Sequence, residues 1–155
     1  MRRRLAIVLG LVTAMAAQHA PPAAWQAAAP QPARGPALAF ASEAGIVLSP
    51  ITPSQTAVFE DVMQKVRDAL EKSTDPVRRQ QAAGWKVYKG ADPFQGLTLY
   101  VSVMDPAVKG ADYNVFEFLQ ETMGDAEARL LFEQFRAAYG GPQHVVNMSP
   151  LLSMK

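Results

Sequence analysis

The spacing of apolar residues changes along this 155-residue chain, and the change limits the folds open to it. Between residues 58 and 70, apolar side chains recur at intervals of three and four, which is typical of a helix with one buried face. In residues 85–89 and 97–104, more and less apolar side chains alternate instead, as they do in half-buried strands. The turn-rich segment 90–96 separates the two alternating runs. The sequence therefore predicts a long helix followed by a β-hairpin.

Shorter segments on either side complete the order of elements. Residues 44–49 and 144–148 are β-prone and predict a first and a last strand. Helical patterns at 115–123 and 128–139 lie before the last strand, with a break at Gly124. This order is that of a ferredoxin-like β-α-β-β-α-β domain, an α+β fold whose antiparallel sheet carries helices on one face. A cystatin-like helix wrapped by an antiparallel sheet is the alternative if the first strand is wrong.

Capping residues predict where the helices begin. The long helix is expected to begin with Thr52 as its cap and Pro53 at its first position, and Gln55 would complete a capping box with Thr52. A short helix is expected at 77–83, and Asp112 is expected to cap the helix that follows the hairpin.

Alternation assigns the two faces of the hairpin. We expect Leu99 and Val101 to pack against Phe59 and Val62 of the long helix. Tyr88, Tyr100 and Met104 are then expected on the face without helices. Because large uncovered apolar surfaces are rare on soluble monomers, the sequence predicts a homodimer through that face.

The N-terminus has the three parts of an export signal. Arg2-Arg3-Arg4 precede an apolar run at 5–12, and Ala14-Met15-Ala16 supply a cleavage motif. We therefore expect a signal peptide at 1–16 and a periplasmic or extracellular protein. The apolar run is too short for a signal anchor, so no stable membrane anchor is expected after cleavage. The chain has no cysteine, which excludes a bacterial lipoprotein anchor and disulfides.

The rest of the chain divides by composition. Residues 17–42 are rich in Ala, Pro and Gln and predict a disordered linker. Residues 43–150 have the size of a single domain, and 151–155 predict a flexible tail.

Charge and motifs exclude several classes of function. Removing the three arginines of the signal leaves 12 basic residues against 14 acidic ones. The mature chain therefore lacks the net positive charge that is typical of a nucleic-acid-binding protein. The chain contains no phosphate-binding loop, dinucleotide glycine pattern or G-x-S-x-G nucleophile motif. Its two histidines, His19 and His144, are a poor basis for a metal centre. We therefore predict no catalytic residue, no metal and no cofactor.

Aromatic residues around the hairpin form the candidate binding site. Trp85, Tyr88, Tyr100 and Tyr113 are expected to line an apolar pocket with hydroxyl groups, and Lys86 would suit an anionic ligand. The alternative is that these aromatic side chains belong to the core and the dimer interface.

Two resemblances accompany these patterns. The segments 75–89, 103–106 and 109–113 resemble a set of uncharacterised exported bacterial proteins. The element order between Gly45 and Met148 resembles the dimeric α+β-barrel superfamily, which includes small antibiotic-biosynthesis-type monooxygenases and in which two such sheets close on each other. The first resemblance implies a bacterial extracytoplasmic domain. The second implies a fold and an assembly but carries over no catalytic residue.

Three functions follow as hypotheses. The leading one is a non-enzymatic, self-associating exported domain that binds a small apolar or anionic ligand. A cofactor-independent oxygenase- or isomerase-like enzyme would use a tyrosine or His144 at the sheet. An envelope interaction or inhibitor module would present an edge or the loop at 90–96 to a protein partner.

Overall fold

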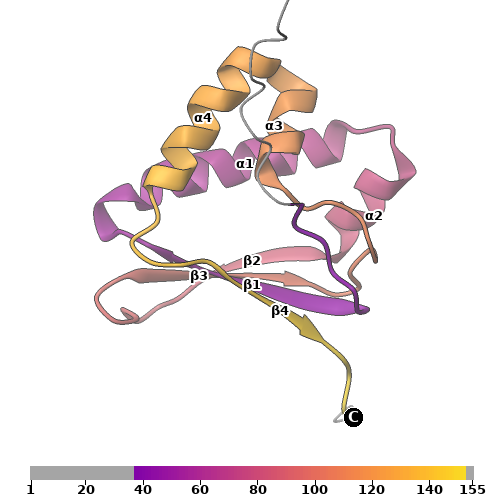
Figure 1. Cartoon of the computed structure of the whole chain (residues 1–155), viewed down its shortest axis with the longest axis horizontal. Coiled ribbons are helices and arrows are strands. Elements are labelled where there is room, and N and C mark those ends of the chain that lie inside the picture. The colour runs from indigo at the N-terminus through magenta and orange to yellow at the C-terminus, as the bar shows by residue number, and fades with distance from the viewer. Residues whose placement is uncertain (1–36, 153–155) are drawn as a thin grey trace, which may run out of the picture. The chain divides into compact units, whose positions relative to one another are not determined.

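The computed structural model describes residues 37–152. The predicted signal peptide, most of the predicted linker and the last three residues lie outside this range. Figure 1 shows how the helices and strands of the described chain are arranged. Their bounds are β1 (Ala44–Ile51), η1 (Pro53–Gln55), α1 (Thr56–Lys72), α2 (Pro76–Gly84), β2 (Trp85–Lys89), β3 (Thr98–Met104), α3 (Val115–Met123), α4 (Asp125–Ala137) and β4 (His144–Met148).

The strands form one four-stranded sheet in the order β2-β3-β1-β4, and every neighbouring pair is antiparallel. The helices lie together on one side of the sheet (Figure 1). The α+β class and the antiparallel sheet predicted from the sequence are confirmed. The predicted hairpin and the last strand are also present.

The long helix α1 provides the centre of the core. Its apolar face is buried as its periodicity predicted, with Phe59, Val62 and Val66 each no more than 2% exposed. The Phe59 ring lies 4.4 Å from the ring of Tyr100 on β3 and 5.3 Å from that of Phe135 on α4, centroid to centroid. One aromatic side chain of α1 therefore joins the sheet to the outer helices.

The predicted faces of β3 are reversed in the structure. Tyr100 and Met104 are buried against the helices, at 3% and 0% exposure. Because side chains alternate along a strand, Leu99 and Val101 point to the opposite face. The prediction that Phe59 and Val62 pack against Leu99 and Val101 is therefore wrong, as is the placement of Tyr100 and Met104 on the bare face.

The physical reason is that both sides of this strand are able to face a core. One side carries the large side chains of Tyr100 and Met104, which bury much surface area when they face a core. The other side carries branched aliphatic side chains. A shift of one residue in strand register exchanges the two sides, and hydrophobicity alone predicts that the more aliphatic side faces the core. In the structure, the aromatic contact between Tyr100 and Phe59 places the Tyr100 side against the helices.

Two predicted helix caps also differ. The Thr52 side chain makes no capping hydrogen bond, and the chain enters α1 through the 3-10 turn η1 instead of a capping box. Asn114, rather than Asp112, caps α3 by accepting from the backbone N–H of Phe116 at 3.0 Å. Asp112 instead accepts from the backbone N–H groups of Leu38 and Asn114.

Residues from the end of the predicted linker pack onto the domain. Phe40 is 1% exposed and lies over Gly45, where an added Cβ would come within 2.1 Å of the phenyl ring. Gly45 is required by this close approach. The folded part therefore includes residues that precede the expected boundary at residue 43.

Candidate ligand pocket between helix α1 and strand β2

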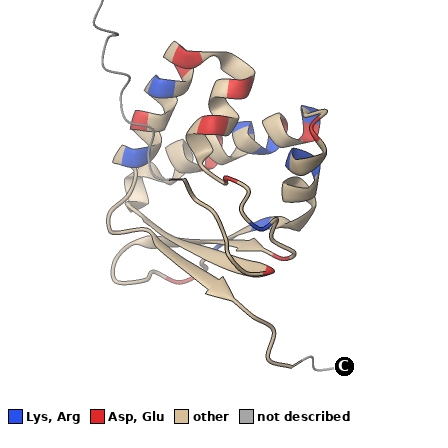
Figure 2. Ribbon diagram, turned by 45° about the vertical axis from the view of Figure 1, so that its right-hand side comes forward, with Lys and Arg blue, Asp and Glu red and all other residues tan. Residues whose placement is uncertain are grey.

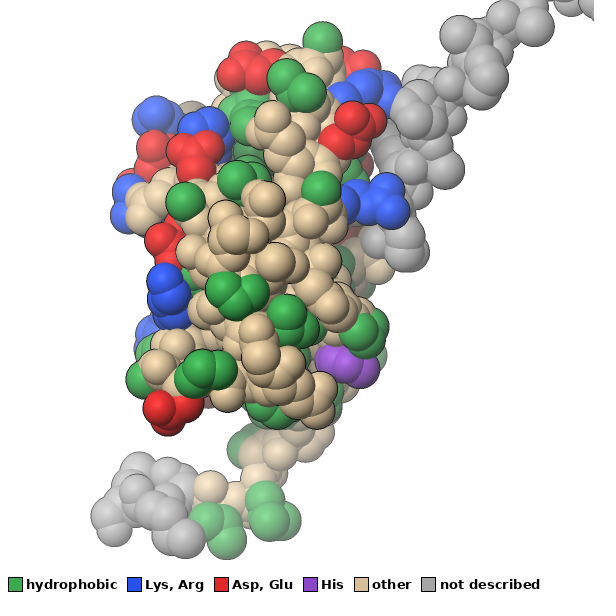
Figure 3. All heavy atoms as spheres, turned by 90° about the vertical axis from the view of Figure 1, so that its left-hand side faces the viewer, with side chains coloured by type: hydrophobic (Ala, Val, Ile, Leu, Met, Phe, Trp, Pro, Cys, Tyr) green, Lys and Arg blue, Asp and Glu red, His purple; other side chains and the backbone are tan. Residues whose placement is uncertain are grey.

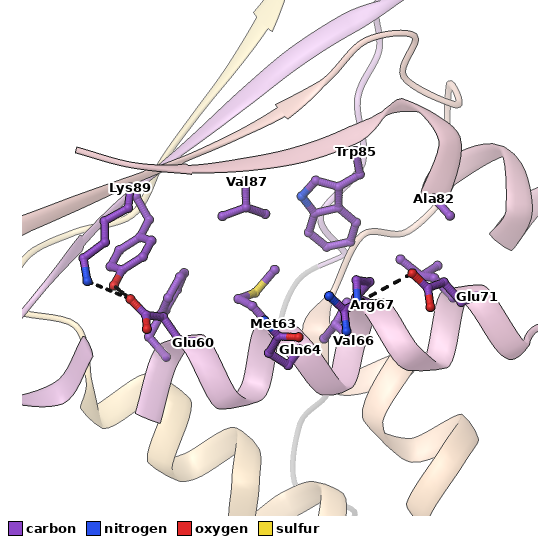
Figure 4. Close-up of a pocket in the computed structure, with 13 residues that line it drawn as sticks. Glu60, Met63, Gln64, Val66, Arg67, Glu71, Ala82, Trp85, Val87 and Lys89 are labelled. Atoms are coloured by element: carbon purple, nitrogen blue, oxygen red, sulfur yellow. Dashed lines mark hydrogen bonds and ion pairs between the residues drawn. The ribbon is translucent and has the colours of Figure 1, made fainter. Parts of the chain in front are cut away.

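An open pocket of about 480 Å³ lies between α1 and the edge strand β2, as Figure 4 shows. This volume is within the usual range for small-molecule sites. Its walls come mainly from two elements and are apolar in the middle and charged at both ends. The lining residues are Phe59, Glu60, Met63, Gln64, Val66, Arg67, Leu70, Glu71, Ala82, Trp85, Val87, Lys89 and Tyr100.

The pocket follows from the register of β2. Pairing with β3 places Trp85, Val87 and Lys89 on the side of the sheet that faces the helices. The helix α1 packs over Tyr100 of β3, so the row of side chains on the outer strand β2 is only partly covered. Val87, at 41% exposure, lies across the opening from Met63 of α1 (Figure 4).

One end of the pocket is closed by three polar side chains. Glu60 accepts hydrogen bonds from the Tyr100 hydroxyl at 2.5 Å and from the Lys89 ammonium at 2.8 Å, both at its Oε1. These bonds, that of Lys89 first, hold the pKa of the Glu60 carboxyl below its ordinary value. Burial and the bond to Glu60 raise the pKa of Tyr100. Tyr100 is therefore a protonated donor at neutral pH, and Glu60 an ionised acceptor.

The other end carries a second pair of opposite charges. Arg67 Nε lies 3.6 Å from a carboxylate oxygen of Glu71, one helical turn further along α1. The guanidinium also contacts Asp68. The charged residues that line the pocket are two acids and two bases, so the pocket has no net formal charge.

Trp85 forms the deep wall and has an unsatisfied donor. Its ring lies against Tyr113 and Phe118, with centroid distances of 5.6 and 5.8 Å. Its indole Nε1 is shielded from solvent and has no hydrogen-bond partner among the described residues. A buried donor without a partner costs about 1–3 kcal/mol of stability, so it is uncommon in native proteins.

The structure separates the five residues predicted from sequence to bind a ligand. Trp85 and Tyr100 both line the pocket. Tyr113 is fully buried behind Trp85, and its hydroxyl accepts from the backbone N–H of Val108. Lys86 and Tyr88 point to the opposite face of the sheet.

Sequence reasoning missed Glu60 and Met63 as pocket residues. Both lie on α1, and Glu60 meets Lys89 across 29 positions of sequence. The pattern of α1 marks Glu60 as a polar position but contains no signal for its partner. Only the packing of α1 over β3 brings the two charges together.

The other side of the sheet has no helix over it within the described residues, and we call it the helix-free face (Figure 1). The strands β1, β3 and β4 contain no Asp, Glu, Lys or Arg, while Figure 2 shows these residues mostly on the helices and loops. In the side view of Figure 3, hydrophobic side chains are visible from the top of the molecule to its lower part, and many of the charged ones lie at the top and along one edge. By strand register, the face consists of Ala44, Ile46, Leu48, Pro50, Lys86, Tyr88, Leu99, Val101, Val103, His144, Val146 and Met148.

Other candidate sites are weaker within residues 37–152. His144 is exposed on the helix-free face, on the side of the sheet away from the pocket. No three His, Cys, Asp or Glu side chains in the described chain come together in a way that could hold a metal ion. None of the described helices combines the length and the hydropathy needed to cross a membrane.

No protein-family model, curated protein or solved structure matches this chain. The geometry of the pocket and of the helix-free face is therefore what supports a functional proposal.

Proposed function

We propose that this protein is an exported, non-enzymatic domain that binds a small ligand in the pocket between α1 and β2 and associates with a second copy of itself. The observation that carries the proposal is the pocket, whose volume of about 480 Å³ and apolar walls suit a small organic molecule. The polar groups at its ends provide orientation. The fold proposed with it is ferredoxin-like, for which the strand order and the antiparallel pairing are the support.

The side chains in the pocket favour binding over catalysis. Tyr100 is held protonated and donates to Glu60, while Glu60 is already engaged by Lys89. A general base has to accept a proton from a substrate, and neither Tyr100 nor Glu60 is placed to do so without breaking this network. His144, the other base considered from the sequence, lies on the opposite face of the sheet.

The helix-free face supports self-association. Tyr88 and Val146 are 55% and 43% exposed on it, and it carries no acidic side chain. A second copy presents the same apolar surface, and a two-fold pairing of like faces is the commonest symmetric assembly. We therefore propose a homodimer through this face.

Ligand binding is tested with a fluorescent apolar probe, N-phenyl-1-naphthylamine. Val87→Glu should weaken binding of this probe by roughly tenfold or more, because it puts a charge at the apolar mouth of the pocket. Val77→Glu is the matched control: Val77 is also 41% exposed but lies on α2, outside the pocket. Binding is measured by fluorescence titration. Equal affinities for the two variants would place the probe elsewhere and contradict the proposal.

Export gives a separate prediction. Protein expressed in its native host should be found outside the cytoplasm with a new N-terminus between Ala17 and Pro21, because signal peptidase cleaves after an A-x-A motif. Intact-mass measurement and N-terminal sequencing of the extracytoplasmic fraction check this. Recovery of mature protein that still contains Arg2 to Arg4 would show that the predicted signal is not removed.

A further inference from the structure

We infer that the ligand of this pocket is an uncharged, mainly apolar molecule whose hydrogen-bond acceptor meets the indole N–H of Trp85. This inference rests on the proposed ligand-binding function and names the chemical class of the ligand. It combines two observations, an unsatisfied donor in the wall of the pocket and a balanced set of charges around it.

The first observation concerns Trp85 Nε1. The atom is shielded from solvent and has no partner among the described residues, although buried indole N–H groups usually find one. Figure 4 shows the indole ring standing between β2 and α1, with its nitrogen on the edge that faces Val87. A carbonyl or ether oxygen of a ligand lying along Val87 would therefore be near this donor. Met63 lines the opposite wall, and its flexible side chain can shift to admit a ligand.

The second observation concerns charge. Lys89 is paired with Glu60, and Arg67 with Glu71, so the two cations of the pocket already have anionic partners. A carboxylate or phosphate would compete with Glu60 or Glu71, and an ammonium ion would compete with Lys89 or Arg67. A charged ligand would also have to leave water for the apolar middle of the pocket, which is costly without a dedicated partner. A neutral ligand does not compete for these ion pairs and does not lose the hydration of an ion.

A single water molecule is the competing partner for Trp85 Nε1. A separate cavity of about 20 Å³ lies in the core, and Trp85, Ser49 and Ser102 are among its lining residues. That is large enough for one water, which would need these polar groups as its partners. If water satisfies the indole N–H there, a ligand in the larger pocket gains nothing from carrying an acceptor.

The experiment compares four molecules of equal chain length on the full mature protein: 2-octanone, 1-chlorooctane, octanoate and octylammonium. Each displaces N-phenyl-1-naphthylamine in a fluorescence competition. We expect 2-octanone to bind roughly 5- to 10-fold more tightly than 1-chlorooctane, which is a poor acceptor, because one hydrogen bond is gained. Octanoate and octylammonium should bind more weakly than the ketone. In Trp85→Phe the ketone and the chloroalkane should bind equally, whatever their absolute affinity.

A second measurement does not depend on a variant that folds. In the ¹H–¹⁵N spectrum of the unsubstituted protein, the Trp85 indole signal should move downfield with 2-octanone but not with 1-chlorooctane. The Trp25 indole, in the predicted linker, is the internal reference. Tighter binding of octanoate or octylammonium than of the ketone, or a Trp85 signal that moves equally with both neutral molecules, would overturn the inference. Failure of the fluorescent probe to bind, by contrast, would contradict the proposed ligand-binding function itself.

Discussion

Phe59→Ala should lower the free energy of unfolding by about 3–5 kcal/mol, the range found when a large aromatic side chain is removed from a core. Phe59 is 2% exposed, and its ring contacts Tyr100, Phe135 and Tyr139 at centroid distances of 4.4, 5.3 and 6.3 Å. These contacts join β3, α1 and the end of α4. The loss is large compared with the total stability of a small domain, about 5–15 kcal/mol.

The measurement is urea unfolding followed by circular dichroism at one fixed protein concentration, since a dimer makes stability depend on concentration. Leu130→Ala provides the control, because Leu130 lies on α4 and is 58% exposed. It should change the unfolding free energy by no more than about 0.5 kcal/mol. An unchanged urea midpoint for Phe59→Ala would mean that α1 does not pack on the sheet through this face.

Two tyrosines of the hairpin should respond in opposite ways to the same substitution. Tyr88→Glu should leave the domain folded but weaken self-association by about 100-fold, as expected when a charge replaces an aromatic residue that contributes strongly to an interface. Tyr88 is 55% exposed on the helix-free face, opposite Val101 of β3. Tyr100→Glu should unfold the domain, because Tyr100 is 3% exposed and an ionised carboxylate there would be buried next to Glu60.

Sedimentation velocity over a micromolar concentration series, with circular dichroism on the same samples, separates these effects. The unsubstituted mature protein should be a dimer, Tyr88→Glu a folded monomer and Tyr100→Glu a poorly folded chain. A monomeric unsubstituted protein at every concentration would contradict the proposed homodimer while leaving the pocket intact. A folded Tyr100→Glu variant would contradict the assignment of the two faces.

Part of the candidate site could be predicted from the sequence. Trp85 and Tyr100 were expected at a pocket near the hairpin, and both line it. Lys86 and Tyr88 were expected there as well, because they are neighbours of Trp85 in the sequence. In a strand, however, adjacent residues point to opposite faces, so nearness in sequence does not bring side chains together. Glu60 and Met63 could not be found at all, because their link to β2 depends on how α1 lies over the sheet.

The sequence by itself determined the element types and their order, since these depend on local properties. Helical spacing at 58–70, alternation at 85–89 and 97–104 and the turn residues at 90–96 each act within a few positions, and the corresponding elements are present. The tertiary structure alone decided which side of β3 is buried. Both sides of that strand are apolar enough for a core, and only the fit of Tyr100 against Phe59 selects one. That choice places Leu99 and Val101 on the helix-free face and turns Trp85, Val87 and Lys89 toward α1, where the pocket forms.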